Sequence, residues 1–150
     1  MSTKTPAIEI SRVVDKDLPG LIELYKQLNP NAPSLENMQQ ALARNQDNPQ
    51  QLALAARVDG QIVGSLMIVT CEMLFGQCKS FMVIEDVVVD SQHRRTGIGR
   101  ALMQHAEEHA LANNCSYIML TTEADRPDAQ RFYRSMGYQS EKYCAFQKRL

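Results

Sequence analysis

Two glycines and three arginines follow an apolar segment about two thirds of the way along the chain. They lie in residues 94–100, Arg-Arg-Thr-Gly-Ile-Gly-Arg, and an apolar segment with helical spacing follows them. The first turn of a helix leaves backbone N–H groups without internal partners, and the helix dipole makes that end positive. Glycine has no Cβ, so an anion can approach the backbone closely. We therefore expect an anion site here, and a diphosphate fits it better than a carboxylate.

Two adjacent carboxylates, Glu85 and Asp86, interrupt the apolar segment 80–90 just before this anion site. Successive side chains of a strand point to opposite faces, so we expect one carboxylate to face a cleft and the other to face the far side of the sheet. Burying a carboxylate in an apolar strand without a partner is unfavourable, which indicates a role for the pair. Two roles stay open: a base for proton transfer, and a structural hydrogen-bond acceptor.

The elements that must position these residues alternate between strands and helices. An Asp59-Gly60 dipeptide between two strands predicts a tight hairpin, Ser34 is the expected N-cap of the second helix, and a reversal is expected near 75–77. The order predicts one mixed α/β domain over residues 1–150, antiparallel in its first half and with a βαβ unit in its second. The expected strands are 8–14, 51–58, 61–69, 80–90, 116–122 and 143–148, and the expected helices are 18–28, 35–42, 97–112 and 129–136.

Sequence motifs narrow the kind of anion site. The Walker pattern GxxxxGK is absent, and Leu102 stands where the Rossmann pattern GxGxxG needs its third glycine. The pattern Gln/Arg-x-x-Gly-x-Gly/Ala is met by Arg94, Gly97 and Gly99, and it resembles the acetyl-CoA pyrophosphate loop of the GCN5-related N-acetyltransferase (GNAT) superfamily. The segment 129–138, AQRFYRSMGY, is similar to the AxxFYxxxG signature of that family, which is followed by Phe or Tyr. The order of the expected elements also resembles this family over nearly the whole chain.

The resemblance implies a fold and a cofactor. The fold is a central, mostly antiparallel twisted sheet with one parallel, splayed pair of strands and helices on both faces. The activity is transfer of an acetyl group from acetyl-CoA to the primary amine of a small molecule, without a metal, and amines bearing phosphate or phosphonate are among the candidates. The pantetheine arm would pair with strand 80–90, and loop amides would hold the pyrophosphate. The residues implied along acetyl-CoA are Val87, Val88, Val89, Arg94, Arg95, Thr96, Gly97, Ile98, Gly99, Arg100 and Tyr133.

The same resemblance assigns catalytic roles. The N–H of Val88 would polarise the thioester carbonyl and stabilise the oxyanion. Tyr133 would protonate the leaving thiolate, although the residue also suits a core aromatic position. Glu85 would accept the proton of the amine, directly or through water, with Asp86 as the alternative base. Arg126 stands where many relatives carry an asparagine that contacts the pantetheine arm, so that contact is not expected here.

Composition and charge set the remaining limits. The 150 residues include 16 Lys plus Arg against 17 Asp plus Glu, and the net charge of −1 argues against a dedicated nucleic-acid binder. Neither a membrane-spanning run nor the apolar stretch of a signal peptide is found, so we expect a cytoplasmic protein without a membrane partner. The four cysteines lack CxxC spacing and predict reduced, mostly buried thiols. His105 and His109 have no evident third ligand, so no metal is expected.

Two other functions stay open. A non-catalytic acetyl-CoA sensor would keep the loop 94–99 but would need neither Tyr133 nor Glu85. A protein or peptide N-acetyltransferase is the other alternative, although no additional domain is expected to recognise a protein substrate. The acceptor pocket is expected from irregular segments, namely 29–34, the turn 73–77 and the C-terminal strand. The resembling family often forms homodimers, and a homodimer is one expected partner state.

Overall fold

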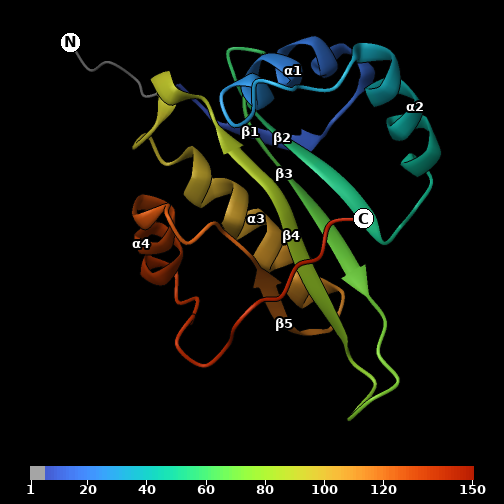
Figure 1. Cartoon of the computed structure of the whole chain (residues 1–150). Coiled ribbons are helices and arrows are strands. Elements are labelled where there is room, and N and C mark those ends of the chain that lie inside the picture. Colours follow the sequence, from blue (N-terminus) through green and yellow to red (C-terminus); the bar gives the residue numbers. More distant parts are fainter. Residues whose placement is uncertain (1–5) are drawn as a thin grey trace. The chain divides into compact units, whose positions relative to one another are not determined.

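A computed structural model describes residues 6–150, and the chain divides into two compact units that meet between Met119 and Leu120. We describe each unit by itself (Figure 1). The second unit holds α4 (Pro127–Ser135). The first unit contains β1 (Glu9–Arg12), η1 (Asp15–Asp17), α1 (Leu18–Lys26), α2 (Leu35–Asn45), β2 (Gln51–Val58), β3 (Gln61–Cys71), β4 (Ser80–Val89), η2 (Ser91–His93), α3 (Ile98–Ala112) and β5 (Cys115–Leu120), which ends at the boundary.

The five strands form one mixed sheet in the order β1-β2-β3-β4-β5. The first four are antiparallel neighbours, and β5 runs parallel to β4 (Figure 1). The predicted hairpin is confirmed, because Asp59 (φ 50°) and Gly60 (φ 79°) both adopt the left-handed conformation that a tight turn between β2 and β3 requires. The predicted cap of α2 is confirmed as well, since the Ser34 side chain accepts a hydrogen bond from the Asn37 N–H at 3.1 Å.

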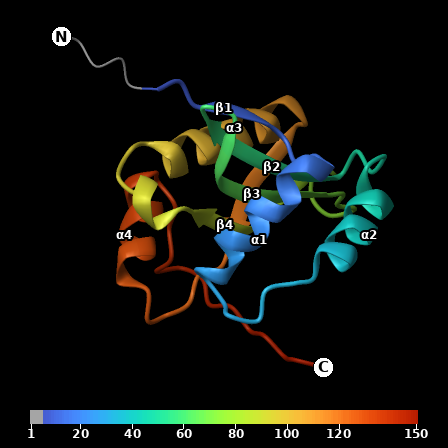
Figure 2. The ribbon, with the colours of Figure 1, turned by 90° about the horizontal axis from the view of Figure 1, so that it is seen from above.

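Helices cover both faces of this sheet in the first unit, as Figure 2 shows. On one face, α1 buries Leu18, Leu21 and Leu24 in a cluster that also includes Val88 of β4. On the other face, α3 packs closely over β3, and a Cβ placed on Gly64 would meet the side chain of Ile98 at 2.9 Å. Glycine is therefore required at position 64 by close approach of helix and sheet, and the mixed α/β prediction with helices on both faces is confirmed.

The predicted strand 143–148 is wrong. No residue after α4 is assigned to a strand in the described part of the chain. Tyr143 and Phe146 are 75% and 94% exposed, so this segment buries little of the apolar area that would fix an extended chain in place. All four cysteines are free, but the prediction of mostly buried thiols is wrong, because Cys71 and Cys115 are only partly buried and Cys78 and Cys144 are exposed.

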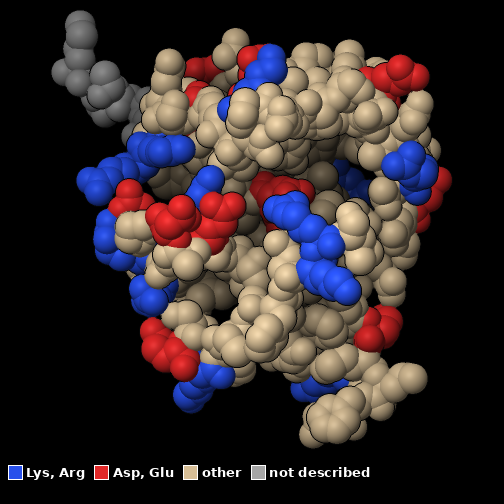
Figure 3. Space-filling view, viewed as in Figure 1, with Lys and Arg blue, Asp and Glu red and all other residues tan. Residues whose placement is uncertain are grey.

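On the one face that Figure 3 shows, Lys and Arg side chains lie among Asp and Glu side chains. Among the described residues, no helix is long and apolar enough to cross a membrane, and no three His, Cys, Asp or Glu side chains gather in an arrangement that would hold a metal ion.

A buried ion pair anchors the start of α1 to the sheet. Arg57 of β2 and Asp17 are each 5% exposed. The Arg57 guanidinium donates to both carboxylate oxygens of Asp17, at 3.0 and 2.5 Å. Burial raises the pKa of Asp17, but the hydrogen bonds from Arg57 and from the Val14 N–H, together with the charges of Arg57 and Lys16, outweigh it, so the folded pKa lies below the ordinary value of 3.8.

Replacing Asp17 with asparagine is expected to lower the free energy of unfolding by about 3–5 kcal/mol, because it leaves the Arg57 charge buried without a partner. In the parent chain this contribution is complete above the ordinary pKa of Asp17 and is lost as the pH falls through the lower, folded value. Urea unfolding at neutral and acidic pH measures both effects. Glu23→Gln is the control, since it breaks the exposed Lys26–Glu23 pair and should change stability by about 1 kcal/mol at most. Equal losses for the two variants would contradict the prediction.

Candidate functional site

The anion site predicted around residues 94–100 forms the entrance of α3. Gly97 adopts a left-handed conformation (φ 87°) that places it as the N-cap, and α3 continues from Ile98. The Gly97 carbonyl accepts the first helical hydrogen bond, from the Ala101 N–H at 2.9 Å. The N–H groups of Ile98 and Gly99 come before this bond and have no carbonyl partner within the helix. No acidic side chain lies in this first turn. The helix entrance therefore presents amide donors and the positive end of a 15-residue dipole to an anion.

The side chains of the loop divide between anchoring and exposure. Ile98 is 2% exposed and fixes the helix start in the core. Arg94, Arg95 and Thr96 are exposed, Arg95 has a left-handed backbone (φ 62°), and the Thr96 hydroxyl donates to the His93 carbonyl. The loop is thus held by its backbone, while the two arginines extend positive charge into solvent beside the helix entrance.

Asp90, directly after β4, connects this loop to α1. Its carboxylate accepts hydrogen bonds from the Gln27 side chain at 3.1 Å and from the Gln92 N–H at 3.3 Å, and it lies 2.9 Å from the His93 ring nitrogen Nδ1. The Gln27 amide oxygen in turn accepts from the Ser91 N–H at 2.9 Å. These contacts, with the bond from Gln27 the largest, hold the pKa of Asp90 below its usual range.

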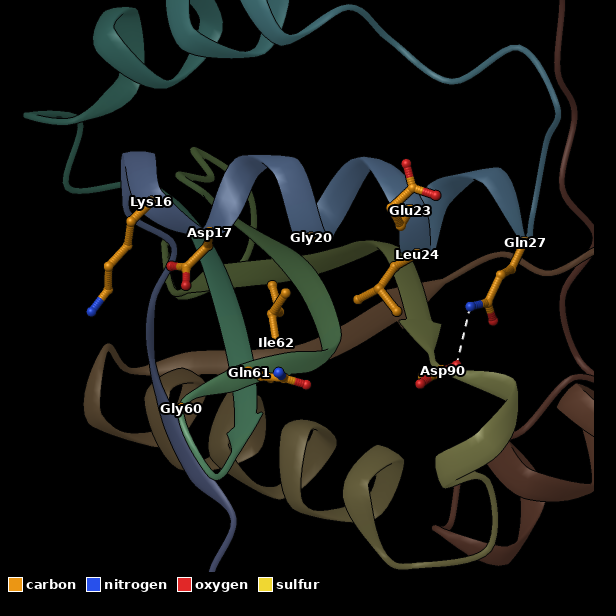
Figure 4. Close-up of a pocket in the computed structure, with 10 residues that line it drawn as sticks. All are labelled: Lys16, Asp17, Gly20, Glu23, Leu24, Gln27, Gly60, Gln61, Ile62 and Asp90. Atoms are coloured by element: carbon orange, nitrogen blue, oxygen red, sulfur yellow. Dashed lines mark hydrogen bonds between the residues drawn. The ribbon is translucent and has the colours of Figure 1, made fainter.

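Figure 4 shows Gln27 reaching Asp90 at one end of a pocket of about 430 Å³, which lies between α1 and the β2–β3 turn. Sequence reasoning did not identify Gln27, because a glutamine after a helix carries no motif. The apolar spacing of residues 18–28 predicts the helix that carries Gln27. The position of Gln27 beside the end of β4 follows only from the fold.

Gln27→Ala is expected to weaken acetyl-CoA affinity about 5-fold, because it removes two hydrogen bonds that fix the start of the loop, worth ~1 kcal/mol together in a partly exposed site. Calorimetric titration with acetyl-CoA measures the change. Gln40→Ala is a matched control, since the Gln40 side chain donates a hydrogen bond to Glu36 within α2, away from the loop. If the two variants bind acetyl-CoA equally well, the connection does not position the loop.

The strand before the loop extends past its parallel neighbour. The Ser116 hydroxyl donates to the Ser80 carbonyl at 3.3 Å, and the rings of Phe81 and Tyr117 stack at 5.1 Å. Counting forward along the two parallel strands places Met119 beside Val83, so β5 ends where residues 85–89 of β4 begin. Among the residues of the first unit that the structure describes, this part of β4 has a strand neighbour only on the β3 side.

The ladder register decides which amides point toward that open edge. The Asp90 N–H donates to the Val63 carbonyl at 2.8 Å, and hydrogen-bonded pairs alternate along an antiparallel ladder. Val88, opposite Ser65, is then in a hydrogen-bonded pair, while Val89, opposite Gly64, directs its N–H away from β3. By the same alternation, the Val87 N–H also points away from β3. The structure therefore departs from the prediction for the Val88 N–H, which points into the sheet.

A β-bulge in β4 interrupts the regular alternation of side chains at Glu85 and Asp86. β4 has two residues, Asp86 and Val87, where β3 has Leu66 alone, and Asp86 adopts a left-handed backbone (φ 55°). Glu85 lies opposite Met67, so both side chains point to the face covered by α1 and α2.

Asp86 occupies the extra position of this bulge, so the regular alternation that predicted opposite faces for Glu85 and Asp86 does not hold there. The Asp86 charge also acts on the hydroxyl of Tyr25 on α1. Burial first, and then the nearby Asp86 charge, raise the pKa of Tyr25 to about 12, although a hydrogen bond with Ser65 opposes them. In the sequence, Tyr25 is one of the apolar positions of the helix expected over 18–28. Its hydroxyl, a polar group on the apolar face of that helix, is the feature that could have marked it as a candidate site residue.

Tyr133 lies on α4 in the second unit. Its ring packs against Phe132 at 5.3 Å and edge-on against Tyr138 at 6.1 Å. Gly137 (φ 92°) ends the helix, which explains the glycine of the signature. Burial raises the pKa of Tyr133, and the Arg126 charge opposes this shift. Arg126 itself pairs with Glu123 at 3.8 Å within the same unit.

Comparison with known proteins decides the family. A family model described as "Acetyltransferase (GNAT) family" matches residues 18–138, which include the α3 entrance, both carboxylates and Tyr133. The chain belongs to the GNAT acetyltransferase family. Its structure is similar to a putative acetyltransferase from Agrobacterium tumefaciens strain C58, with a TM-score of 0.87, 30% sequence identity and coverage of 95% of this chain and 99% of that one.

Two curated relatives of this GNAT chain align with it over very different fractions of their length. Glucosamine 6-phosphate N-acetyltransferase of Trypanosoma brucei brucei is 27% identical over 141 residues, which cover 90% of this chain and 91% of that protein. The uncharacterized protein YdhI of Bacillus subtilis strain 168 is 42% identical over 55 residues, which cover 37% of this chain and only 34% of YdhI. The chain thus spans about a third of one relative and nearly all of the other.

Proposed function

We propose that this GNAT protein transfers an acetyl group from acetyl-CoA to the primary amine of a small molecule, by direct attack in a ternary complex. The observation that carries the proposal is the α3 entrance at Gly97, which follows directly on the open edge of β4. We also propose that both units belong to one acetyltransferase domain over residues 1–150, which is supported by a family match that includes parts of each.

The residues present fit acetyl-CoA. Amide donors at the start of α3 and the exposed arginines 94 and 95 suit a pyrophosphate, and Gly97 leaves open space where a side chain would stand. The outward amides of Val87 and Val89 suit the amide groups of a pantetheine arm, which would pair with the edge of β4 as an added strand does. When bound, acetyl-CoA supplies an activated acetyl thioester.

The proposed roles of the side chains follow the proton balance. Glu85 accepts one proton from the substrate ammonium, directly or through water, with Asp86 as the alternative. The freed lone pair of the nitrogen forms the C–N bond to the acetyl carbon, the C–S bond breaks, and its electron pair leaves with the sulfur. The acylated nitrogen then releases its second proton to solvent. Tyr133 donates a proton to the sulfur, solvent returns a proton to Tyr133 and takes one from Glu85, and the whole reaction releases one proton. An outward amide of β4 stabilises the charge that develops on the carbonyl oxygen.

Glu85→Gln is expected to lower kcat/KM for the amine about 100-fold near neutral pH, because the amide cannot accept the ammonium proton. The loss should shrink as the pH approaches the pKa of the amine, where the free base is supplied by solution. Initial rates of thiol release over pH measure both effects. Glu72→Gln, an exposed change outside the bulge, is the control, and Asp86→Asn tests the alternative base. A parent-like rate for Glu85→Gln beside a large loss for Asp86→Asn would transfer the role to Asp86.

A thiol-release screen with acetyl-CoA tests the function itself. The panel contains amino sugars including glucosamine 6-phosphate, aminophosphonates, polyamines, arylalkylamines, amino acids and peptides. We expect turnover of at least one small amine together with calorimetric binding of acetyl-CoA. Binding without turnover across the panel would favour a sensor, and peptides that react far faster than every small amine would favour a protein N-acetyltransferase.

A further inference from the structure

A second cavity of about 450 Å³ lies within the first unit, between the helices α1 and α2 and the strands β2 and β3. This volume falls within the range of about 300–1,000 Å³ that small-molecule sites occupy. Its side chains are predominantly apolar. The apolar walls include Leu18, Leu21, Met38, Leu42, Leu52 and Met67.

The helix α2 lines the cavity with side chains that pack against the core but are not fully buried. Its apolar residues recur at helical spacing, yet none of its residues is fully buried, and Met38 and Leu42 are only half-buried. An amphipathic helix usually buries its apolar face against the core. Here part of that face lines the cavity, so it stays available to an apolar ligand.

Glu85 and Asp86 do not line the cavity themselves, but two of its wall residues are their neighbours. Met67 lines it, and Met67 is the cross-strand neighbour of Glu85 on the same face of the sheet. Tyr25 also lines it, and Tyr25 lies close enough to Asp86 to experience its charge. Two independent wall residues, one on β3 and one on α1, therefore place the cavity beside the candidate base.

The charges around the cavity indicate the class of ligand. Among its described lining residues, Arg12 is the single cationic side chain, and it is exposed, where it donates to the Gln46 carbonyl at 3.3 Å. The buried guanidinium of Arg57 on the adjacent strand is already paired with Asp17. The walls thus suit a hydrocarbon group and offer no buried cation to a phosphate.

We propose that this cavity binds the apolar body of an aliphatic or arylalkyl primary amine and directs its amino group toward Glu85 and Asp86. The proposal rests on the acetyl transfer proposed above and names its acceptor class. Apolar burial supplies the affinity, and the carboxylates attract the ammonium group. Amines that carry phosphate are poorer acceptors, because the described lining of the cavity offers the phosphate no buried cation.

Filling the cavity tests the proposal. Leu42→Trp adds bulk on α2, and Leu111→Trp adds the same bulk at a 78% exposed position of α3 as the matched control. We expect Leu42→Trp to raise the KM for phenethylamine at least 10-fold while the KM for acetyl-CoA stays within 2-fold, and Leu111→Trp to behave as the parent. Phenethylamine alone should raise the Tm of the parent and of Leu111→Trp but not of Leu42→Trp. Met38→Trp, one turn away, should reproduce the result if Leu42→Trp does not fold.

Two outcomes would overturn the acceptor class without touching the acetyl transfer. One is turnover of glucosamine 6-phosphate with no turnover or thermal stabilisation by phenethylamine and hexylamine. The other is an equal response of apolar and phosphorylated amines to cavity filling. A chain that neither binds acetyl-CoA nor releases thiol with any amine would instead contradict the proposed function itself. The thermal shift with phenethylamine, which needs no acetyl-CoA, separates the two failures.

Discussion

Tyr133→Phe should lower kcat for thiol release about 100-fold, because the variant keeps the aromatic ring and loses the proton that the sulfur would take. The packing of the ring against Phe132 and Tyr138 does not need the hydroxyl, so α4 should remain folded. Affinity for acetyl-CoA should stay within about 2-fold of the parent, because the hydroxyl is assigned to the sulfur after the C–S bond weakens. Single-turnover thiol release and calorimetry measure the two quantities.

The pH profile provides a sharper check on Tyr133. Burial holds the pKa of its phenol above the ordinary value of 10.0, so the acid keeps its proton over the whole neutral range. The alkaline decline of kcat should therefore begin above pH 10, and it should be absent from Tyr133→Phe. Tyr143→Phe, at a 75% exposed position of the same unit, is the control. An unchanged kcat in Tyr133→Phe would leave the residue with a packing role only.

Gly97→Ala should weaken acetyl-CoA binding at least about 10-fold. Alanine at a φ of 87° costs ~1–2 kcal/mol, and its Cβ would occupy the open space at the helix entrance that the pyrophosphate is proposed to approach. The affinity loss and the stability loss are separable, because calorimetry measures the first and urea unfolding the second.

A second glycine of the chain isolates the binding effect. Gly76, at the tip between β3 and β4, also has a positive φ (64°), and a Cβ added there would meet open space. Gly76→Ala should therefore lose a similar amount of stability and keep its affinity for acetyl-CoA. If both alanine variants lose affinity to the same degree, the effect arises from general destabilisation and the helix entrance is not the site.

The parts of the site that depend on local rules were predictable from the sequence. Gly97 before an amphipathic segment identified the helix entrance, and Asp59-Gly60 identified the hairpin, because each requires a backbone conformation that few residues adopt. The hydrophobic spacing of residues 18–28 predicted α1 within two residues of its observed end at Lys26.

The features that depend on pairing between strands were not predictable in this way. Nothing in the run Ile84-Glu85-Asp86-Val87 states that one residue is left out of the ladder, so strict alternation assigned the carboxylates to opposite faces. The direction of the Val88 N–H follows from the same ladder. The strand predicted at 143–148 failed because an apolar run forms a strand only where backbone partners receive it.

The bulge gives β4 one residue more than its pairing with β3 needs. Between the paired positions Met67–Glu85 and Ser65–Val88, β3 supplies one residue and β4 supplies two. A β4 shortened by Asp86 would still place Glu85 and Val88 on their present face, since one residue between partners is what regular pleating needs. The surplus residue therefore adds a second carboxylate to β4 without setting the orientation of Glu85 or Val88, and its left-handed backbone costs ~1–2 kcal/mol in most side chains.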